Sequence, residues 1–365
     1  MILSQFLIVL LISASCTAVL IFAERWHISL TGDTATEARH KVHAGTVPRV
    51  GGVAVYVAGL TGLALLSPAL PDITAKILWM LWGCLTIVFV TGLIEDLTRA
   101  VSPALRYIAA LGAALLFSIA HDGYGISSVG ITPLDTPLNL SWIRIGFFAF
   151  AVASLSHAFN LIDGQNGLCA GVSILTFVAL AITAQKTGQA PLAQLSWIMA
   201  TANLGFLVFN FPFGRIFIGD GGAYFNGAIA AVITVFVVQG AGGTSPWLAI
   251  LLLIYPVWET LFSMARRWHA GRPFYVADDR HLHHLAARAL RRFAAKGRSY
   301  AALPVVLLVA PFVLAAPQVL DNTAAMIGLA AAFVAVYGLA YFALSRAYPE
   351  PAEPRSPGHS RGRRH

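Results

Sequence analysis

The sequence predicts an all-α, polytopic integral membrane protein with about 11 transmembrane helices. Hydrophobic residues make up 58% of the 365 residues and charged residues only 11%, which is more apolar surface than one soluble core can bury. Stretches of roughly 17 to 23 apolar residues recur along the chain, and each is long enough to cross a hydrocarbon core about 30 Å thick. Basic residues gather between alternate stretches, as expected of a chain that crosses the membrane repeatedly.

Helices are the expected spanning form, because a helix satisfies its own backbone hydrogen bonds inside lipid. The first apolar stretch lacks a basic segment before it and is followed by Arg25, so it predicts an uncleaved span rather than a signal peptide. In chain order, the expected spans are residues 4–23, 50–68, 77–95, 103–121, 142–160, 167–184, 193–210, 223–240, 246–265, 300–317 and 323–345. They form one transmembrane domain over residues 1–345, followed by a basic tail over 346–365 that is Pro- and Arg-rich and is expected to be disordered.

The distribution of positive charge predicts the orientation. With the N-terminus in the periplasm and the C-terminus in the cytoplasm, all of the 24 Lys and Arg residues except Lys76, Arg144 and Lys186 lie on the cytoplasmic side. Loops rich in Lys and Arg are retained there. These residues are spread over juxtamembrane loops with no binding fold beside them, so no nucleic-acid partner is expected.

Five cytoplasmic loops carry polar clusters, whereas the opposite loops are short or built from Gly, Pro, Ser and Thr. The loops expected to form a site are residues 24–49, 96–102, 161–166, 211–222 and 266–299. Their sequences include HKVHAGTVPRVGG from His40, GLIEDLTRAVS from Gly92, NLIDGQNGL from Asn160, NFPFGRIFIGDGG from Asn210 and DDRHLHH from Asp278. Function is therefore expected at the cytoplasmic face.

The acidic residues of these loops each allow a structural and a functional interpretation. Glu95 and Asp96 close a span at its C-terminal end, where the helix dipole is already negative; either water solvates them or a cation binds there. Asp163 follows Asn160 by three residues, on one face of a continuing helix, although Asp-Gly also favours a simple turn. Asp220 could cap the next span, and the glycines around it would let a ligand approach the backbone.

Three histidines, His281, His283 and His284, lie among arginines near the end of the last long loop. They fit a zinc site or a phosphate cradle, and zinc is the poorer interpretation because no cysteine lies nearby. Carboxylates for a hard divalent cation, together with His, Arg and Lys for phosphate oxygens, describe a phosphoryl-transfer site. Arg106 is a further candidate for binding substrate phosphate.

In this order and on one face, the five clusters resemble the polyprenyl-phosphate N-acetylhexosamine-1-phosphate transferase family, over roughly residues 40 to 285. The resemblance implies transfer of a sugar 1-phosphate from a UDP-N-acetylhexosamine to undecaprenyl phosphate, with release of UMP. This reaction would initiate a cell-surface polysaccharide such as O-antigen, capsule or exopolysaccharide. The implied cofactor is Mg²⁺, for which Mn²⁺ can substitute. The implied location is the bacterial inner membrane, with the protein in contact with membrane lipid and a homodimer as one possible assembly.

The resemblance also assigns residues. Glu95 and Asp96 match the paired acids that handle Mg²⁺ or activate the lipid phosphate, and Asp220 is the expected metal ligand together with Asp96. The remaining matches are a catalytic Asp163, the nucleotide-binding residues Asn160, Asn166 and Asn210, the phosphate-contacting His281, His283 and His284, and Lys41 and His43 at the start of the first motif.

Departures from the family pattern refine these assignments. The first of the paired acids is Glu95 rather than Asp, and Asn166 stands where many members carry a second Asp. Thr46-Val47-Pro48-Arg49 replaces the Thr-Pro-Thr-Met of the branch that uses muramoyl pentapeptide, which favours a simple N-acetylhexosamine donor. Phospho-N-acetylmuramoyl-pentapeptide translocase, a membrane transporter and a non-catalytic partner in a glycan assembly complex remain the alternatives.

Overall fold

The computed structural model describes residues 2–33, 47–240, 244–273, 280–293 and 297–348. Most of them are helical. The α-helices are α1 (Ile2–Phe22), α2 (Glu24–Thr31), α3 (Gly52–Leu66), α4 (Asp72–Thr98), α5 (Pro103–Ala120), α6 (Thr132–Leu138), α7 (Ser141–Leu161), α8 (Leu168–Lys186), α9 (Ala190–Asn210), α10 (Gly219–Gly240), α11 (Trp247–Leu252), α12 (Ile254–His269), α13 (Leu282–Phe293), α14 (Ala302–Ala315) and α15 (Thr323–Ala347). Two-residue strands, β1 (Gly32–Asp33) and β2 (Val47–Pro48), form an antiparallel pair in which Gly32 faces Pro48.

Within the described residues, nine helices are long and apolar enough to cross a membrane: α1, α3 with the 3-10 turn after it, α4, α5, α7, α8, α9, α10 and α15. This confirms a polytopic helical membrane protein, and these nine helices match nine of the expected spans. The total of eleven crossings and the direction of the chain stay predictions.

The other two expected spans differ from the simple helices that their apolar stretches suggested. Residues 246–265 are divided at Leu253 into the short α11 and the separate α12. Pro256 lies in the first turn of α12, where its ring prevents a continuous helix from running back into α11. Residues 300–317 contain α14, a helix of only 14 residues, followed by a 3-10 turn.

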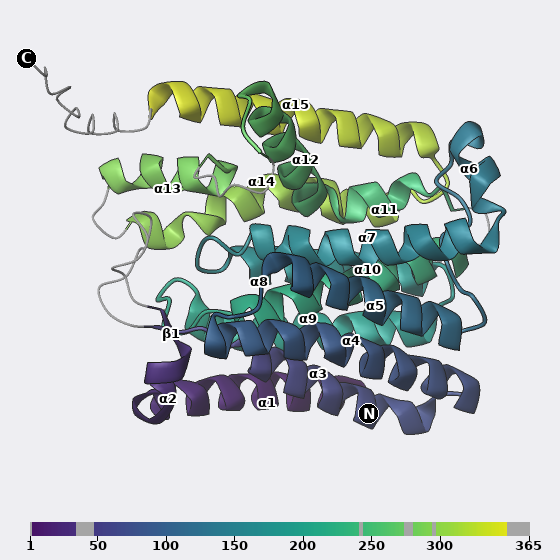
Figure 1. The fold of residues 1–365 in the computed structure, drawn as a ribbon, viewed down its shortest axis with the longest axis horizontal. Helices are drawn as coiled ribbons and strands as arrows, with labels where there is room; N and C mark the ends of the chain where they lie inside the picture. Colours follow the sequence, from purple (N-terminus) through teal and green to yellow (C-terminus); the bar gives the residue numbers. More distant parts are fainter. Residues whose placement is uncertain (1, 34–46, 241–243, 274–279, 294–296, 349–365) are drawn as a thin grey trace, which may run out of the picture.

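The long helices lie side by side in a bundle, and α12 crosses them steeply near α15 (Figure 1). α10 is the central helix and packs against α3, α4, α7 and α8. Its side chains are buried along almost its whole length, because it has neighbours on every side. The first residues of α10 are therefore surrounded by the ends of other helices.

One end of the bundle collects the loops that carry the polar clusters. α2, the strand pair and α13 lie at this end, whereas α6 lies at the other (Figure 1). The start of α1 and the end of α15 are at opposite ends of the bundle, as the predicted positions of the two termini require.

Candidate functional site

The N-terminus of α10 is capped by a carboxylate from another helix. Asp96, in the last turn of α4, accepts hydrogen bonds from the backbone N–H groups of Asp220 (2.8 Å) and Gly221 (2.9 Å). The positive end of the α10 dipole thus stabilises a carboxylate that the C-terminal end of α4 would repel. Asp220 was expected to precede a span that starts at residue 223 and to cap it. The helix instead begins at Gly219, so Asp220 lies inside its first turn and Asp96 supplies the cap.

Close backbone contacts bring these elements together. Gly219 has a φ of +72°, a conformation that favours glycine, and a Cβ there would collide with the Arg49 carbonyl and the Asp96 carboxylate. At Gly221, which packs on α4, a Cβ would lie 3.0 Å from the Leu93 nitrogen. The glycines after Asp220 thus allow α10 to approach α4 at the site.

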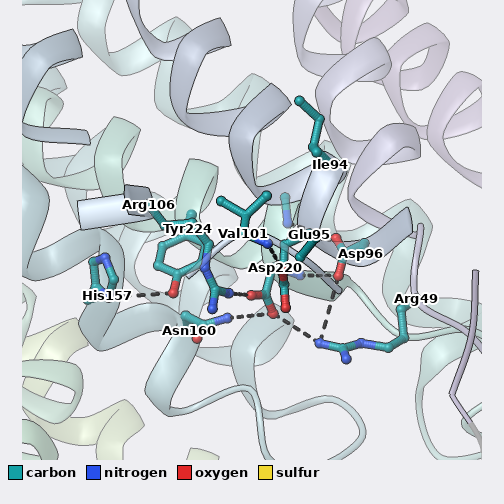
Figure 2. Close-up of polar contacts among 12 residues, drawn as sticks. Arg49, Ile94, Glu95, Asp96, Val101, Arg106, His157, Asn160, Asp220 and Tyr224 are labelled. Carbon is teal, nitrogen blue, oxygen red and sulfur yellow. Dashed lines mark hydrogen bonds and ion pairs between the residues drawn. The ribbon is translucent and has the colours of Figure 1, made fainter. Parts of the chain in front are cut away.

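Three side chains from separate elements bind the Asp220 carboxylate (Figure 2). Arg106 of α5 forms an ion pair with Oδ2. Arg49, from the segment after β2, donates to Oδ1 at 3.0 Å, and Asn160 of α7 donates to the same oxygen at 3.1 Å. The same Arg49 nitrogen lies 3.7 Å from Asp96. Two carboxylates and two guanidinium groups therefore form one compact cluster.

Asp163 lies in the loop after α7, half-buried beside this cluster. Loss of water around it raises the pKa of its carboxyl well above the usual range, while the positive charge of Arg49 lowers that pKa and the Asp96 carboxylate raises it. These mutual influences mean that Asp163 and the Asp96–Asp220 cluster share one electrostatic environment.

Asn210 binds protein backbone with both ends of its amide. Its Oδ1 accepts from the Gly167 N–H at 2.6 Å, and its Nδ2 donates to the Ile216 carbonyl at 2.7 Å. Asn210 thus holds the loop after α7 against the loop before α10. This arrangement supports a positioning role for a residue that was expected to contact the nucleotide. Asn166 is buried in the first of these loops.

The two adjacent acids differ in their surroundings. Glu95 accepts a hydrogen bond from the Val101 N–H at 2.7 Å through Oε2. It therefore braces the turn between α4 and α5, whereas Asp96 contacts α10 directly. This geometry favours Asp96 over Glu95 as the acid of the cluster.

The histidines begin α13 and are held by a buried acid. Glu259 of α12 is fully buried; its Oε1 lies 2.9 Å from His281 Nδ1 and its Oε2 accepts from the Tyr337 hydroxyl at 2.9 Å. His281 and His283 stack at 5.4 Å between ring centroids, and the ring of His284 lies 4.3 Å from that of His283. Glu259 joins α12, α13 and α15 and fixes where the histidines lie.

His283 faces the loop that contains Asp163. A Cβ on Gly164 would collide with His283 Nε2, so the imidazole lies directly on the Gly164 backbone. Burial lowers the pKa of His283 well below its usual value, and His284 and His281 lower it further. Within the described residues, neither ring nitrogen of His283 has a hydrogen-bond partner.

The structure thus brings together Asp96, Arg106, Asn160 and Asp220 by direct contact, with Asp163 and the histidine helix next to them. Lys41 and His43 lie outside the described residues. Two site residues were not assigned from the sequence. Arg49 was treated as a cytoplasmic charge and as the end of the Thr46–Arg49 stretch, and Glu259 was given no role, although a buried acid in an apolar stretch requires a partner.

The donor set fits a magnesium ion. Asp220 Oδ2 has a second lone pair beyond its ion pair with Arg106, and Mg²⁺ commonly binds one or two carboxylates together with substrate phosphates and water. In the part of the chain that the structure describes, no three His, Cys, Asp or Glu side chains are placed to hold a metal by themselves. A magnesium ion at Asp220 would therefore share its ligands with a phosphate substrate.

Parts of this chain are similar to known proteins. Residues 78–238 match the model described as Glycosyl transferase family 4. A probable undecaprenyl-phosphate N-acetylglucosaminyl 1-phosphate transferase of Bacillus subtilis is 27% identical over 68% of this chain and 67% of the relative. A decaprenyl-phosphate N-acetylglucosaminephosphotransferase of Mycolicibacterium smegmatis is 28% identical over 75% of this chain and 74% of its own length.

A third relative carries a different activity in its name. The phospho-N-acetylmuramoyl-pentapeptide-transferase of Listeria monocytogenes is 27% identical over 60% of this chain and 68% of that protein. All three names describe transfer of a phosphosugar by a related group of enzymes. The motifs and the comparisons agree: this membrane-spanning chain is similar to glycosyl transferase family 4 over residues 78–238 and to transferases along much of its length.

Proposed function

We propose that this protein transfers N-acetylhexosamine 1-phosphate from a UDP-sugar to undecaprenyl phosphate and releases UMP. The observation that carries the proposal is the Asp220 cluster, in which Arg49, Arg106 and Asn160 surround one carboxylate at the end of a membrane bundle. Such a cluster can bind phosphate groups that arrive from the lipid and from the cytoplasm. The product would begin a cell-surface polysaccharide at the bacterial inner membrane.

The proposed reaction needs little proton transfer. An oxygen of the lipid phosphate attacks the β-phosphorus of the UDP-sugar, and the bond from this phosphorus to the oxygen bridging to the α-phosphorus breaks. UMP leaves with that oxygen, and the sugar stays on the β-phosphate. The second pKa of a phosphate monoester is about 6, so the attacking group is already a dianion at neutral pH. The total charge of the two substrates equals that of the two products.

The residues of the site would mainly orient phosphates and offset their charge, as is usual in phosphoryl transfer. Arg49 and Arg106 supply the positive charge. Asp163 belongs to the loop that contacts His283, and Asn160 lies in the last turn of α7 just before this loop. These positions suit both residues to hold the uridine diphosphate while the histidines contact its phosphates. Asp96 would hold the start of α10, and with it Asp220, in position.

Asp220 and Asp96 are the residues that would hold Mg²⁺. When bound, the ion would neutralise the pyrophosphate and stabilise the leaving UMP. Mn²⁺ has the same preference for carboxylate and water ligands, so it is expected to support activity as well.

A simple N-acetylhexosamine is favoured over a muramoyl pentapeptide donor by Arg49. The Thr-Val-Pro-Arg stretch ends in this residue, and its guanidinium binds Asp220 at 3.0 Å. The Listeria relative nevertheless keeps the pentapeptide donor as the second candidate.

The experiment is a transfer assay with purified protein, undecaprenyl phosphate and a panel of UDP-sugars, in which UMP is quantified and the lipid product is weighed by mass spectrometry. We expect UMP release with UDP-N-acetylhexosamines that stops with EDTA and returns with Mg²⁺, and an Asp220→Ala variant that is folded but inactive. Lack of UMP release with every donor would refute the enzyme assignment and favour a transporter or a non-catalytic partner.

A further inference from the structure

We propose that Arg106, Tyr224 and His157 form the subsite for the phosphate of the lipid acceptor, on the bilayer side of Asp220. The proposal rests on the proposed function and assigns a role to Tyr224 and His157, two residues from membrane-spanning helices. The ligand class is a phosphate monoester on a polyprenyl chain.

The depth of these residues separates them from the nucleotide loops. Tyr224 is four residues into α10 from Asp220, which is about 6 Å along the helix axis. His157 precedes Asn160 by three residues, or about 4.5 Å, in α7, and α7 ends at Leu161. Both side chains therefore lie further into the bundle than Asp220 and Asn160. A phosphate attached to a membrane-embedded chain reaches this level directly.

The three side chains form a contiguous row that starts at Asp220 (Figure 2). Arg106 binds Asp220 and places its guanidinium 5.4 Å from the centroid of the Tyr224 ring. The Tyr224 ring meets the His157 imidazole edge to face, with centroids 4.6 Å apart. The Tyr224 hydroxyl lies 3.4 Å from His157 Nδ1. The row thus links the carboxylate cluster to the interior of the bundle.

Helix packing fixes this row before any substrate arrives. Ser156 donates to the Tyr224 carbonyl at 2.9 Å, and a Cβ on Gly227 would lie 2.6 Å from the Leu155 carbonyl. α7 and α10 are therefore in close backbone contact beside Tyr224 and His157. A preorganised set of donors loses little entropy when it binds a ligand.

The row contains buried polar atoms that no other described residue satisfies. The Arg106 side chain is 10% exposed, and its Nε is buried without a hydrogen-bond partner, as is His157 Nε2. With the Tyr224 hydroxyl donating to Nδ1, the imidazole carries its proton on Nε2. Two N–H donors, one on Arg106 and one on His157, then remain available beside Tyr224. Buried polar groups of this kind ordinarily have a partner, and phosphate oxygens would supply it.

The test compares the two substrates in steady-state kinetics of Tyr224→Phe and His157→Ala. We expect the KM for undecaprenyl phosphate to rise roughly 10-fold in each variant. His157→Ala loses a hydrogen bond to the charged phosphate, and Tyr224→Phe loses the hydroxyl that keeps the imidazole proton on Nε2. The KM for the UDP-sugar should stay at the wild-type value. Tyr56→Phe and His121→Ala are matched controls that remove the same chemical groups elsewhere in the bundle, and neither should change either KM.

A direct binding measurement separates this proposal from the proposed function. A short-chain polyprenyl phosphate is titrated into detergent-solubilised protein, with the corresponding polyprenyl alcohol as a ligand that lacks the phosphate. Wild-type protein should prefer the phosphate over the alcohol, and both variants should lose that preference while melting at the wild-type temperature. A rise in the KM for the UDP-sugar instead, or an unchanged preference for the phosphate, would overturn the subsite even if the enzyme is active. Phosphate-selective binding without UMP release would retain the subsite and reject the proposed reaction.

Discussion

Arg49 connects the segment after β2 to both acids of the cluster, at 3.0 Å from Asp220 and 3.7 Å from Asp96. Arg49→Ala should lower the rate of UMP release roughly 10- to 100-fold, because a hydrogen bond to a charged group contributes about 1.5 to 3 kcal/mol. Arg49→Lys should recover only part of this rate, since an ammonium lacks the planar fork of donors. The exposed Arg25→Ala is the control, and an Arg49→Ala enzyme with full activity would exclude Arg49 from the site.

Glu95 and Asp96 are neighbours with different tasks, and amide substitutions should separate them. Glu95→Gln keeps an oxygen that can accept from the Val101 N–H, so most transfer activity should remain. Asp96→Asn puts an NH₂ group against the N–H of Asp220 or Gly221, which leaves a donor facing a donor. We expect at least a 10-fold loss of activity. UMP release from both purified variants provides the measurement, and equal losses would contradict the assignment.

At the scale of single residues, the motifs predicted most of the cluster. Asp220, Asp96 and Asn160 were found because short polar runs stand out between apolar stretches. The side-chain contacts were not predictable in the same way. Spacing does not reveal that Asn210 binds the Gly167 and Ile216 backbone, or that Glu95 turns toward Val101, because both depend on how the loops fold over one another.

The histidine helix α13 depends on Glu259 of α12, which is fully buried. Glu259→Ala should loosen α13 and reduce transfer more than 10-fold, because it leaves the buried His281 and Tyr337 groups without their acceptor. Tyr337→Phe removes one of these partners and should have a smaller effect. Hydrogen exchange of the α13 backbone, read together with UMP release, tests both. Glu24→Ala, on the exposed face of α2, is the control. Unchanged exchange in Glu259→Ala would contradict the anchoring role.

The packing of α13 should also depend on pH. Burial lowers the pKa of His283, so its neutral form is favoured in the packed state. When the pH falls below about 6.5, the ordinary histidine value, the unpacked state gains a proton that the packed state does not, and stability decreases with falling pH. Intrinsic amide exchange slows as the pH falls. After correction for that slowing, the backbone of α13 should therefore become less protected from exchange between pH 7.5 and 5.5. His283→Gln should reduce the pH dependence of α13 exchange. If that variant keeps the wild-type pH profile, a group other than His283 causes the dependence.

At the scale of elements, apolar length predicted the long helices well and the broken ones poorly. Nine expected spans correspond to helices of sufficient length, because one property, hydrophobicity over about 20 residues, decides them. The stretch 246–265 also satisfies that property, yet it divides at Leu253. Pro256 was visible in the sequence and gave the signal. The buried role of Glu259 was not visible, since its partners lie on α13 and α15.

At the scale of the whole molecule, loops that are distant in the sequence lie close together because the chain crosses the membrane back and forth. Helices that cross a membrane in turn return every second loop to the same face, so the five motifs were expected at one end. The structure brings four of them together through Asp96, Asn160, Asp220 and His283, with Arg49 at the edge of the first. The centrality of α10 was not predicted, because hydropathy does not distinguish a helix surrounded by protein from one that faces lipid.

The last prediction concerns which end of the bundle faces the cytoplasm. Single cysteines are placed at Ala100, beside the site, and at Asn139, at the α6 end, in a variant whose three native cysteines are replaced by serine. Both positions are exposed. If the charge distribution sets the orientation, a membrane-impermeant thiol reagent should label the Asn139→Cys variant in intact cells and the Ala100→Cys variant only in inside-out vesicles. Permeabilised cells should give equal labelling at the two positions, which controls for their reactivity. The opposite pattern would put the Asp220 cluster on the outer face, where a cytoplasmic nucleotide-sugar has no access to it.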